Sequence, residues 1–172
     1  LLVTAAALEA GLQPETIESA LRCFEGVPHR LESLGTVQGI PVFNDSKATN
    51  YDAAAVGLQA VPNPVVLLAG GQTKQGDAQP WLQLLKERSS AVVLFGSGAE
   101  ELRGLIESSA FTGAVTTHRD LVDAVPHALE LARQQQAASL LLSPACASFD
   151  QYSDFEARGN HFRELIAASQ ST

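Results

Sequence analysis

The sequence predicts an α/β fold, a three-layer Rossmann-like domain with a mostly parallel sheet covered by helices on both faces. Two observations support this prediction. Apolar runs such as VVLLA (65–69) and AVVLF (91–95) show no polar alternation, as is typical of strands buried on both faces. The segments between such runs have apolar residues at helical spacing. Residues 1–28 show only the helical pattern, so we expect the α/β domain to occupy residues 29–172.

A helical hairpin is expected first. Residues 1–10 form an apolar helical run that stops at Gly11, a residue type that favours helix C-termini. A second helix begins at Pro14, which suits a first turn, and continues to about Phe24. The chain contains no Met and opens inside the first helix. We therefore expect residues 1–28 to be the helical end of a preceding domain.

Strands and helices then alternate. Gln38 and Gly39 are typical of a tight turn between two short strands, 34–37 and 40–43. Further strands are expected at 65–69, 91–95, 114–117 and 139–142, and helices at 52–60, 80–88, 99–108, 121–135 and 155–169. Ligands bind parallel sheets outside the carboxyl ends of the strands. Functional residues are therefore expected in the segments that follow strands: 44–50, 70–77, 96–100 and 143–150.

Composition excludes several classes of function. The 172 residues carry a formal charge of −8, which argues against a broad nucleic-acid-binding surface. No apolar run approaches the length of a membrane span. Cys23 and Cys146 match no metal-binding spacing; we interpret both as reduced thiols, although a disulfide remains an alternative. We expect a cytoplasmic protein with no nucleic-acid or membrane partner and no metal site in this segment.

The segment NDSKATN (44–50) lies where a strand leads into a helix. Free backbone N–H groups and the helix dipole favour an anion at such a point. Lys47 adds a positive charge suited to phosphate or carboxylate, and Asp45 could accept from a ribose hydroxyl. The alternative is that the polar residues only cap the helix, which explains the hydroxyls but not the lysine. Both interpretations remain open on composition alone.

Two glycine-rich segments follow buried strands. In GGQTKQGD (70–77) the paired glycines allow close backbone approach, and Lys74 could contact a second anion. The alternative is a flexible turn with a solvated lysine, and the P-loop pattern is absent from the chain. GSGAEE (96–101) begins like a dinucleotide fingerprint, but Glu101 occupies the third glycine position. A tight strand-to-helix turn is the favoured interpretation there.

The last strand is followed by SPACASFD (143–150). Its backbone and Ser148 could hold a carboxylate. Cys146 has no base nearby in sequence, so a buried structural role is favoured over a nucleophilic one. Arg30, at the entry to the α/β domain, offers a planar donor group for phosphate.

The order of these motifs carries more information than any one of them. The runs FEGVPHRLE, NDSKATN, LLAGGQTKQGD and LLSPACASFDQYSDFEARGNHF resemble the Mur ligases of peptidoglycan synthesis, in particular the branch that adds D-glutamate. The resemblance extends from residue 1 to about 165. It implies an ATP-dependent amide ligase of three domains, of which this chain holds the C-terminal amino-acid-binding domain (29–172) and the helical remnant of the central ATPase domain (1–28). The fragment alone is expected to be inactive.

The resemblance also implies partners and chemistry. The partners would be D-glutamate, ATP, UDP-N-acetylmuramoyl-L-alanine and the rest of the protein's own chain, with Mg²⁺ ligands in the missing central domain. ATP would activate the L-alanine carboxylate as an acyl phosphate, which the amine of D-glutamate then attacks. One alternative is a folylpolyglutamate synthase-like or other Mur ligase domain that adds a different amino acid. A second is a stand-alone dinucleotide-binding module, which Glu101 argues against.

Site residues follow from the matched motifs. The resemblance assigns D-glutamate binding to Thr49, Lys74, Ser148, Phe149 (through its backbone) and Phe155. It assigns nucleotide binding to Arg30, Asp45 and Lys47, with supporting roles for His29 and Asn44. Lys47, between phosphate and amino acid, is the catalytic candidate. Gln72-Thr73 and Tyr152 depart from the family pattern without removing a ligand.

Overall fold

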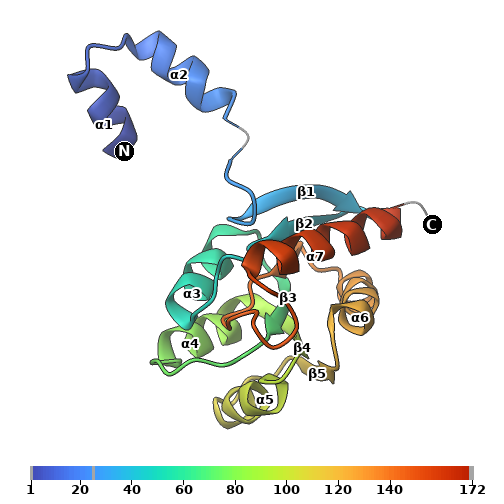
Figure 1. The fold of residues 1–172 in the computed structure, drawn as a ribbon. Helices are drawn as coiled ribbons and strands as arrows, with labels where there is room; N and C mark the ends of the chain where they lie inside the picture. The colour runs from blue at the N-terminus through green and yellow to red at the C-terminus, as the bar shows by residue number, and fades with distance from the viewer. Residues whose placement is uncertain (1, 25, 171–172) are drawn as a thin grey trace.

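The computed structural model describes residues 2–24 and 26–170, and it shows the predicted alternation of strands and helices (Figure 1). The strands are β1 (Glu32–Val37), β2 (Ile40–Asn44), β3 (Val65–Gly70), β4 (Ser89–Phe95), β5 (Ala114–His118) and β6 (Ser139–Leu142). The helices are α1 (Leu2–Glu9), α2 (Pro14–Arg22), α3 (Tyr51–Ala60), α4 (Gln79–Arg88), α5 (Ala99–Ser108), α6 (Leu121–Gln134) and α7 (Phe155–Gln170). The predicted ends differ from these by only one or two residues at most boundaries.

The six strands form one sheet in the order β1-β2-β6-β3-β4-β5. β1 runs antiparallel to β2, and the other neighbouring pairs are parallel, so the predicted mostly parallel sheet is confirmed. Gln38 and Gly39 both have positive φ, 51° and 85°, as a two-residue hairpin turn requires. After the edge strand β5, the chain returns through α6 and inserts β6 between β2 and β3. This insertion places the ends of β2, β6 and β3 side by side.

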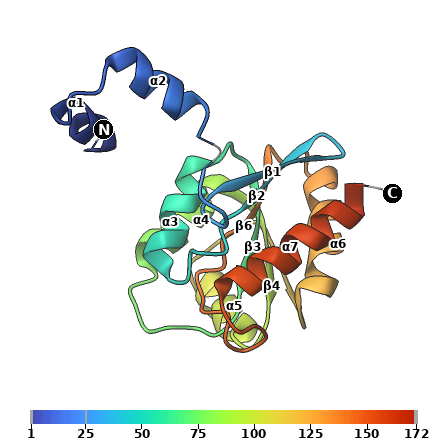
Figure 2. The same ribbon diagram turned by 45° about the horizontal axis from the view of Figure 1, so that its top comes forward.

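The sheet has a helical layer on each face (Figure 2). In β3, Val65 and Leu67 pack in the cluster that contains side chains of α3, α4 and α5. Val66 and Leu68 pack in the opposite cluster, with α6 and α7. All six residues of β3 are buried. The uninterrupted apolar pattern of this strand therefore reflects burial on both faces, and the three-layer fold class is confirmed.

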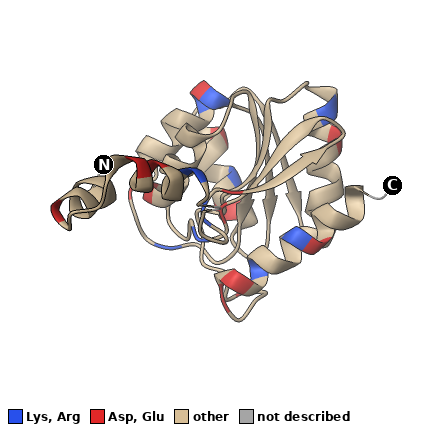
Figure 3. Cartoon of the chain, turned by 90° about the horizontal axis from the view of Figure 1, so that it is seen from above, with Lys and Arg blue, Asp and Glu red and all other residues tan. Residues whose placement is uncertain are grey.

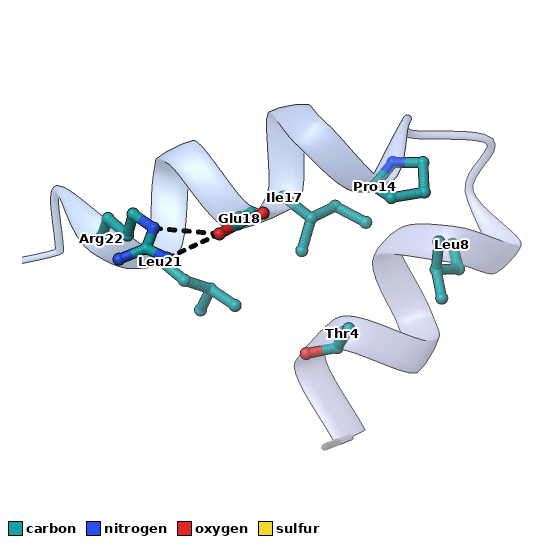
Figure 4. A pocket seen from close by; sticks show the side chains of 7 residues that line it. All are labelled: Thr4, Leu8, Pro14, Ile17, Glu18, Leu21 and Arg22. Carbon is teal, nitrogen blue, oxygen red and sulfur yellow. Dashed lines mark hydrogen bonds and ion pairs between the residues drawn. The ribbon is translucent and has the colours of Figure 1, made fainter.

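The N-terminal helices α1 and α2 project away from these layers (Figures 1 and 2). Of their described residues only Ile17 is buried, whereas Leu2 is 88% exposed. A pocket of about 390 Å³ lies between the two helices (Figure 4), lined by Thr4, Leu8, Pro14, Ile17, Glu18, Leu21 and Arg22. The helices confirm the predicted hairpin. Its assignment to a preceding domain stays a prediction.

The sequence also led us to expect reduced cysteines and no membrane span. Cys23 is exposed and Cys146 is buried, and neither forms a disulfide. No helix in the described part of the chain has the length and apolar character needed to cross a membrane.

Candidate functional site

Three loops meet at the carboxyl edge of the sheet, because β2, β6 and β3 are neighbours there. The backbone N–H of Asp45, after β2, donates to Leu142 O at 2.7 Å, and Ser143 N, after β6, donates to Leu68 O at 3.1 Å. Gln72 and Ala147 exchange two backbone hydrogen bonds of 2.9 Å between the loops after β3 and β6. Three of the four segments singled out from the sequence thus lie side by side.

The first pocket on this surface, here called the Ser148 pocket, has a volume of about 280 Å³. It combines the two ammonium groups of Lys47 and Lys74 with the two carboxylates of Asp154 and Glu156, within a wall that includes an aromatic ring. Charged segments of both signs lie near one another where the loops meet (Figure 3). Its complete lining is Lys47, Thr49, Lys74, Ala147, Ser148, Phe149, Asp154, Phe155 and Glu156. The structure therefore brings together all five residues predicted for amino-acid binding.

Ser148 is a buried residue of this pocket. The residue is only 2% exposed, yet its hydroxyl has no hydrogen-bond partner among the described residues. Its carbonyl accepts from the backbone N–H groups of Gln151 and Tyr152, at 3.1 and 2.8 Å, which fixes the turn. The Phe149 side chain is 68% exposed at the rim. A polar ligand could thus satisfy a hydroxyl that the protein itself leaves free.

A second pocket of about 280 Å³, here called the Asp45 pocket, opens beside the first. Its lining is Arg30, Leu31, Asp45, Lys47, Ala48, Ala53, Val56 and Gly57. Asp45 accepts from Leu31 N at 3.2 Å through Oδ1 and from Ser143 Oγ at 2.9 Å through Oδ2. Each carboxylate oxygen can accept a further hydrogen bond, so Asp45 retains capacity for a ligand hydroxyl.

The electrostatic state of Asp45 follows from its burial. Burial raises the pKa of this carboxyl to about 6, and the hydrogen bonds from Ser143 and Leu31 and the charge of Arg30 oppose the shift only partly. Gly57 in α3 leaves the room that the carboxylate occupies, because a Cβ there would collide with Asp45. A glycine inside a helix thus has a packing reason at this site.

Lys47 lines both pockets and a third of about 370 Å³ formed with Val27, Pro28, His29, Arg30, Phe155 and Glu156. Its Nζ lies 3.7 Å from the centroid of the Phe155 ring. The lysine predicted to stand between phosphate and amino acid therefore lies on the wall shared by the pockets.

His29 and Asn44 lie beneath this surface. Asn44 is fully buried; its Nδ2 donates to Glu32 Oε2 and Gly159 O at 3.1 and 3.2 Å and lies 3.0 Å from His29 Nδ1. Burial lowers the pKa of His29, although the Glu32 carboxylate opposes the shift. The carbonyl of His29 accepts from Lys47 N at 3.0 Å. Both residues thus shape the loop. Asn44 lines none of the three pockets, whereas His29, although largely buried, borders the third.

Arg158 is the residue that the sequence analysis missed. It is fully buried in α7, and its Nε donates to Ser46 Oγ at 3.0 Å while Nη2 donates to Ser46 O at 2.9 Å. Its Nη1 donates to Cys146 O, Ala147 O and Gly70 O at 3.1, 3.3 and 3.4 Å. Burial lowers its pKa to about 10, so the guanidinium stays charged at neutral pH. One side chain therefore ties together the loops after β2, β3 and β6.

A signal for Arg158 was present in the sequence. Phe155, Phe162 and Ile166 recur at helical spacing, and Arg158 falls on the same face. An arginine on the apolar face of a helix is buried only when its donors are satisfied. The loop carbonyls that satisfy it come from distant segments, which is why spacing alone did not reveal them.

The glycines after the strands serve close packing. Gly70 and Gly71 have φ of 141° and 120°, and a Cβ on either would collide with the backbone of Phe95 or Ala147. Gly96 forms the expected tight turn, where Ser97 N donates to Asp150 Oδ2 at 2.9 Å. Cys146 is buried, and burial raises the pKa of its thiol to about 12, which fits a structural role.

Comparison of the sequence with protein families identifies the family to which the chain belongs. Residues 29–146 match the family described as Mur ligase, glutamate ligase domain. The chain belongs to the Mur ligase family. It is similar to proteins named UDP-N-acetylmuramoylalanine--D-glutamate ligase, with 62% identity over 99% of the chain in Parasynechococcus marenigrum and 52% over 98% in Synechococcus elongatus. It spans only 37% and 36% of the length of these two relatives.

Solved Mur ligase-like structures support the fold. A Mycobacterium tuberculosis folylpolyglutamate synthase complexed with ADP and AMPPCP aligns with a TM-score of 0.64. The alignment covers 90% of this chain and 35% of the synthase chain. The UDP-N-acetylmuramate-alanine ligase of Thermotoga maritima aligns with a TM-score of 0.61. The alignment covers 97% of this chain and 36% of the ligase chain. Each is 17% identical to this chain, so these structures establish the fold alone.

Proposed function

We propose that this chain is the C-terminal, amino-acid-binding part of an ATP-dependent ligase that adds D-glutamate to UDP-N-acetylmuramoyl-L-alanine. The names of relatives up to 63% identical support this substrate. The observation that carries the proposal is the Ser148 pocket, where loops from three strands bring two ammonium groups, two hydroxyls and two carboxylates together. In this proposal residues 29–172 form the amino-acid-binding domain.

D-Glutamate matches the chemistry of this pocket. It carries two carboxylates and one ammonium, and charge-assisted hydrogen bonds fix such groups in direction as well as in distance. We assign one carboxylate to Lys74 and Thr49 and the other to Ser148 and the Phe149 backbone, with Phe155 closing the pocket. The ligand is held at both ends, so its amine has a fixed direction.

The Asp45 pocket suits a nucleotide. Arg30 offers a planar donor group to phosphate, Asp45 an acceptor to a ribose hydroxyl, and Lys47 a charge at the boundary with the amino acid. His29 and Asn44 support the loop from below. The ADP and AMPPCP complexes of the folylpolyglutamate synthase agree with a nucleotide in proteins of this fold. ATP would supply the activation of the acceptor carboxylate.

Magnesium does not fit the residues described here. In residues 2–24 and 26–170 no group of three or more His, Cys, Asp or Glu side chains is placed to hold a metal ion. We therefore propose that Mg²⁺ is held elsewhere in the longer protein.

The contribution of this chain to the reaction is positioning. Fixing an amine next to the carbonyl that it attacks replaces a bimolecular encounter and can lower a barrier by roughly 7–11 kcal/mol. Lys47 lies on the wall that the two pockets share and can offset charge there. Because only part of the machinery lies in this chain, we expect no turnover from it alone. We also place the protein in the cytoplasm, in keeping with its two free thiols.

The N-terminal hairpin fits the same scheme. We assign residues 1–28 to the end of a preceding ATPase domain, which would cover the apolar pocket of α1 and α2 (Figure 4). Hydrogen exchange tests this: amides of α2 should exchange rapidly in the 172-residue chain and slowly in the full-length protein. Equal exchange in the two would contradict the assignment.

Calorimetry with D-glutamate tests the amino-acid pocket. The isolated chain holds part of the site, so binding should be weaker than micromolar, which corresponds to about −8 kcal/mol. In the full-length enzyme, Lys74→Ala should abolish complementation of a strain that lacks the ligase. Lys86→Ala is the matched control, because Lys86 lies on α4 outside both pockets. Normal D-glutamate incorporation by the Lys74 variant would refute its role.

A second assay distinguishes D-glutamate from L-glutamate as the substrate. The full-length enzyme, given D- and L-glutamate in turn, should use the D-enantiomer. Preference for L-glutamate would favour the folylpolyglutamate synthase-like alternative, for which the solved structures provide similarity of fold only.

A further inference from the structure

The Lys47 ammonium has an unusual partner. Its Nζ lies 3.7 Å from the centroid of the Phe155 ring, well inside the range in which a cation is attracted to an aromatic face. Within the described part of the chain, Nζ makes neither an ion pair nor a hydrogen bond. Among the described residues, the ring is therefore the one group with which the ammonium has a directed interaction.

Phe155 is itself held from two sides by buried groups. Its carbonyl accepts from Ser46 Oγ at 2.8 Å, and Ser46 Oγ in turn accepts from Arg158 Nε at 3.0 Å. Its ring meets the His29 ring edge-on, with centroids 6.3 Å apart and planes at 77°. Because Ser46, Arg158 and His29 are all buried, the position of the ring is set by the core of the site.

We propose that Phe155 is a positioning residue whose ring holds the Lys47 ammonium on the wall between the Ser148 and Asp45 pockets. An aromatic face attracts a cation without neutralising its charge. A carboxylate in the same place would form an ion pair, occupy N–H donors and cancel the charge that an anionic ligand needs. The ring also limits the many rotamers of a long lysine side chain, so less freedom is lost when a ligand binds.

This role separates Phe155 from a residue that only closes a pocket. A closing residue needs size and apolar surface, which leucine also provides. A ring that holds a cation needs electron density on its face, which leucine lacks and which fluorine withdraws. The presence of the ring over Lys47 is independent of the proposed function, whereas its effect on ligation rests on that function. The two parts are therefore tested separately.

NMR of the 172-residue chain tests the contact. The Lys47 ε-CH₂ group is bonded to Nζ, which lies over the ring, so we expect its protons to be shifted upfield by the ring current. Phe155→Leu should return them to the ordinary position, while the ε-CH₂ protons of Lys86 stay unchanged. Lys47 protons at the ordinary position in the unmodified chain would overturn the proposal.

Kinetics of the full-length ligase test the consequence. Replacing Phe155 with 4-fluoro-, 3,5-difluoro- and 3,4,5-trifluorophenylalanine weakens the ring face stepwise with little change in size. We expect kcat/KM for D-glutamate to fall with each fluorine, by about 3- to 10-fold over the series, with Phe155→Trp above Phe155→Leu. Equal values across the series would overturn the positioning role. An enzyme that rejects D-glutamate altogether would refute the proposed function instead, and the NMR shift would still decide the contact.

Discussion

Asp45 lies in the loop after β2, and Arg158 donates to Ser46 of the same loop. Both are buried charges, but their hydrogen bonds differ. Neither forms an ion pair among the described residues. Arg158 is fully buried and donates to five oxygens from three loops. Asp45 receives two hydrogen bonds and borders a pocket. Every guanidinium nitrogen of Arg158 thus donates to the protein, whereas Asp45 has acceptor capacity left over at the edge of a pocket.

We interpret this difference as one between a structural charge and a candidate ligand-binding charge. A buried charge that is hydrogen-bonded to several segments stiffens them, and Arg158 stiffens the loops that carry the pocket residues. A carboxyl with a shifted pKa at the edge of a pocket is a candidate for function. Asp45 and Arg158 are both buried, so burial does not distinguish them. The number of their hydrogen-bond partners does.

Replacing Arg158 tests the first half of this comparison most strongly. Arg158→Met keeps an unbranched stem but removes one donor from each of five oxygens, of which Ala147 O retains Gln72 N. We expect the free energy of unfolding to fall by about 3–5 kcal/mol, because each buried oxygen left without a donor costs about 1–3 kcal/mol. Urea denaturation of the 172-residue chain measures this. The stability of Arg158→Lys should lie between that of the unmodified chain and that of Arg158→Met. A loss below about 1 kcal/mol for Arg158→Met would contradict the structural role of Arg158.

Asp45→Asn tests the other half and should act in the opposite direction. The folded-state pKa of Asp45 is about 6, above its ordinary value of 3.8, so the folded state binds more protons between these pH values. Its contribution to stability therefore falls as pH rises from about 4 to 6 and remains low at pH 7. The asparagine removes the buried charge, so it should stabilise the chain at pH 7 on the order of 2–3 kcal/mol.

The pH profile supplies the control for this variant. The difference in unfolding free energy between Asp45→Asn and the unmodified chain should shrink towards pH 4, where the carboxyl is protonated in the folded state. A difference that stays constant from pH 4 to 8 would show that Asp45 does not titrate in that window.

Gly57→Ala probes the space around Asp45. The new Cβ would collide with the Asp45 carboxylate and lie 3.0 Å from Ser143 Oγ, which outweighs the gain in helix propensity. We expect a loss of about 1–2 kcal/mol in chemical denaturation, as is usual for added methyl groups in packed sites. The same substitution with Asp45→Ala should cost much less, because the colliding group is gone. Equal costs in both backgrounds would place the strain elsewhere.

Local pattern was sufficient for the elements and insufficient for the contacts between them. Uninterrupted apolar runs predicted β3 and β4, and Gln38-Gly39 predicted the β1–β2 turn, because these signals depend on near neighbours in sequence. The insertion of β6 between β2 and β3 depends on which edges pair, and no local signal specifies that. The same limit explains the site: the motifs after the strands were visible, but the single arginine that joins their loops was not.

The family resemblance predicted specific roles for site residues, whereas composition alone left alternatives open. For NDSKATN, capping and anion binding were both open. Capping is confirmed for Asn50, whose side chain accepts from Ala53 N at 2.8 Å, whereas Lys47 and Thr49 line the Ser148 pocket and their role in anion binding stays a prediction. Asn44 shows the reverse limit, since a residue within a functional motif proved to be fully buried. Burial by distant segments cannot be inferred from a motif alone.

An exposed charge completes the comparison and should have the smallest effect. Glu130 accepts from Arg133 at 2.7 Å and from Gln134 at 2.7 Å on the outer face of α6, and the Arg133 guanidinium lowers its pKa to about 2. Water screens such a pair, so its pKa shift does not translate into stability. We expect Glu130→Gln to leave the denaturation midpoint at pH 7 unchanged within error. A shift as large as that of Asp45→Asn would mean that burial is not what makes the charges of Asp45 and Arg158 important.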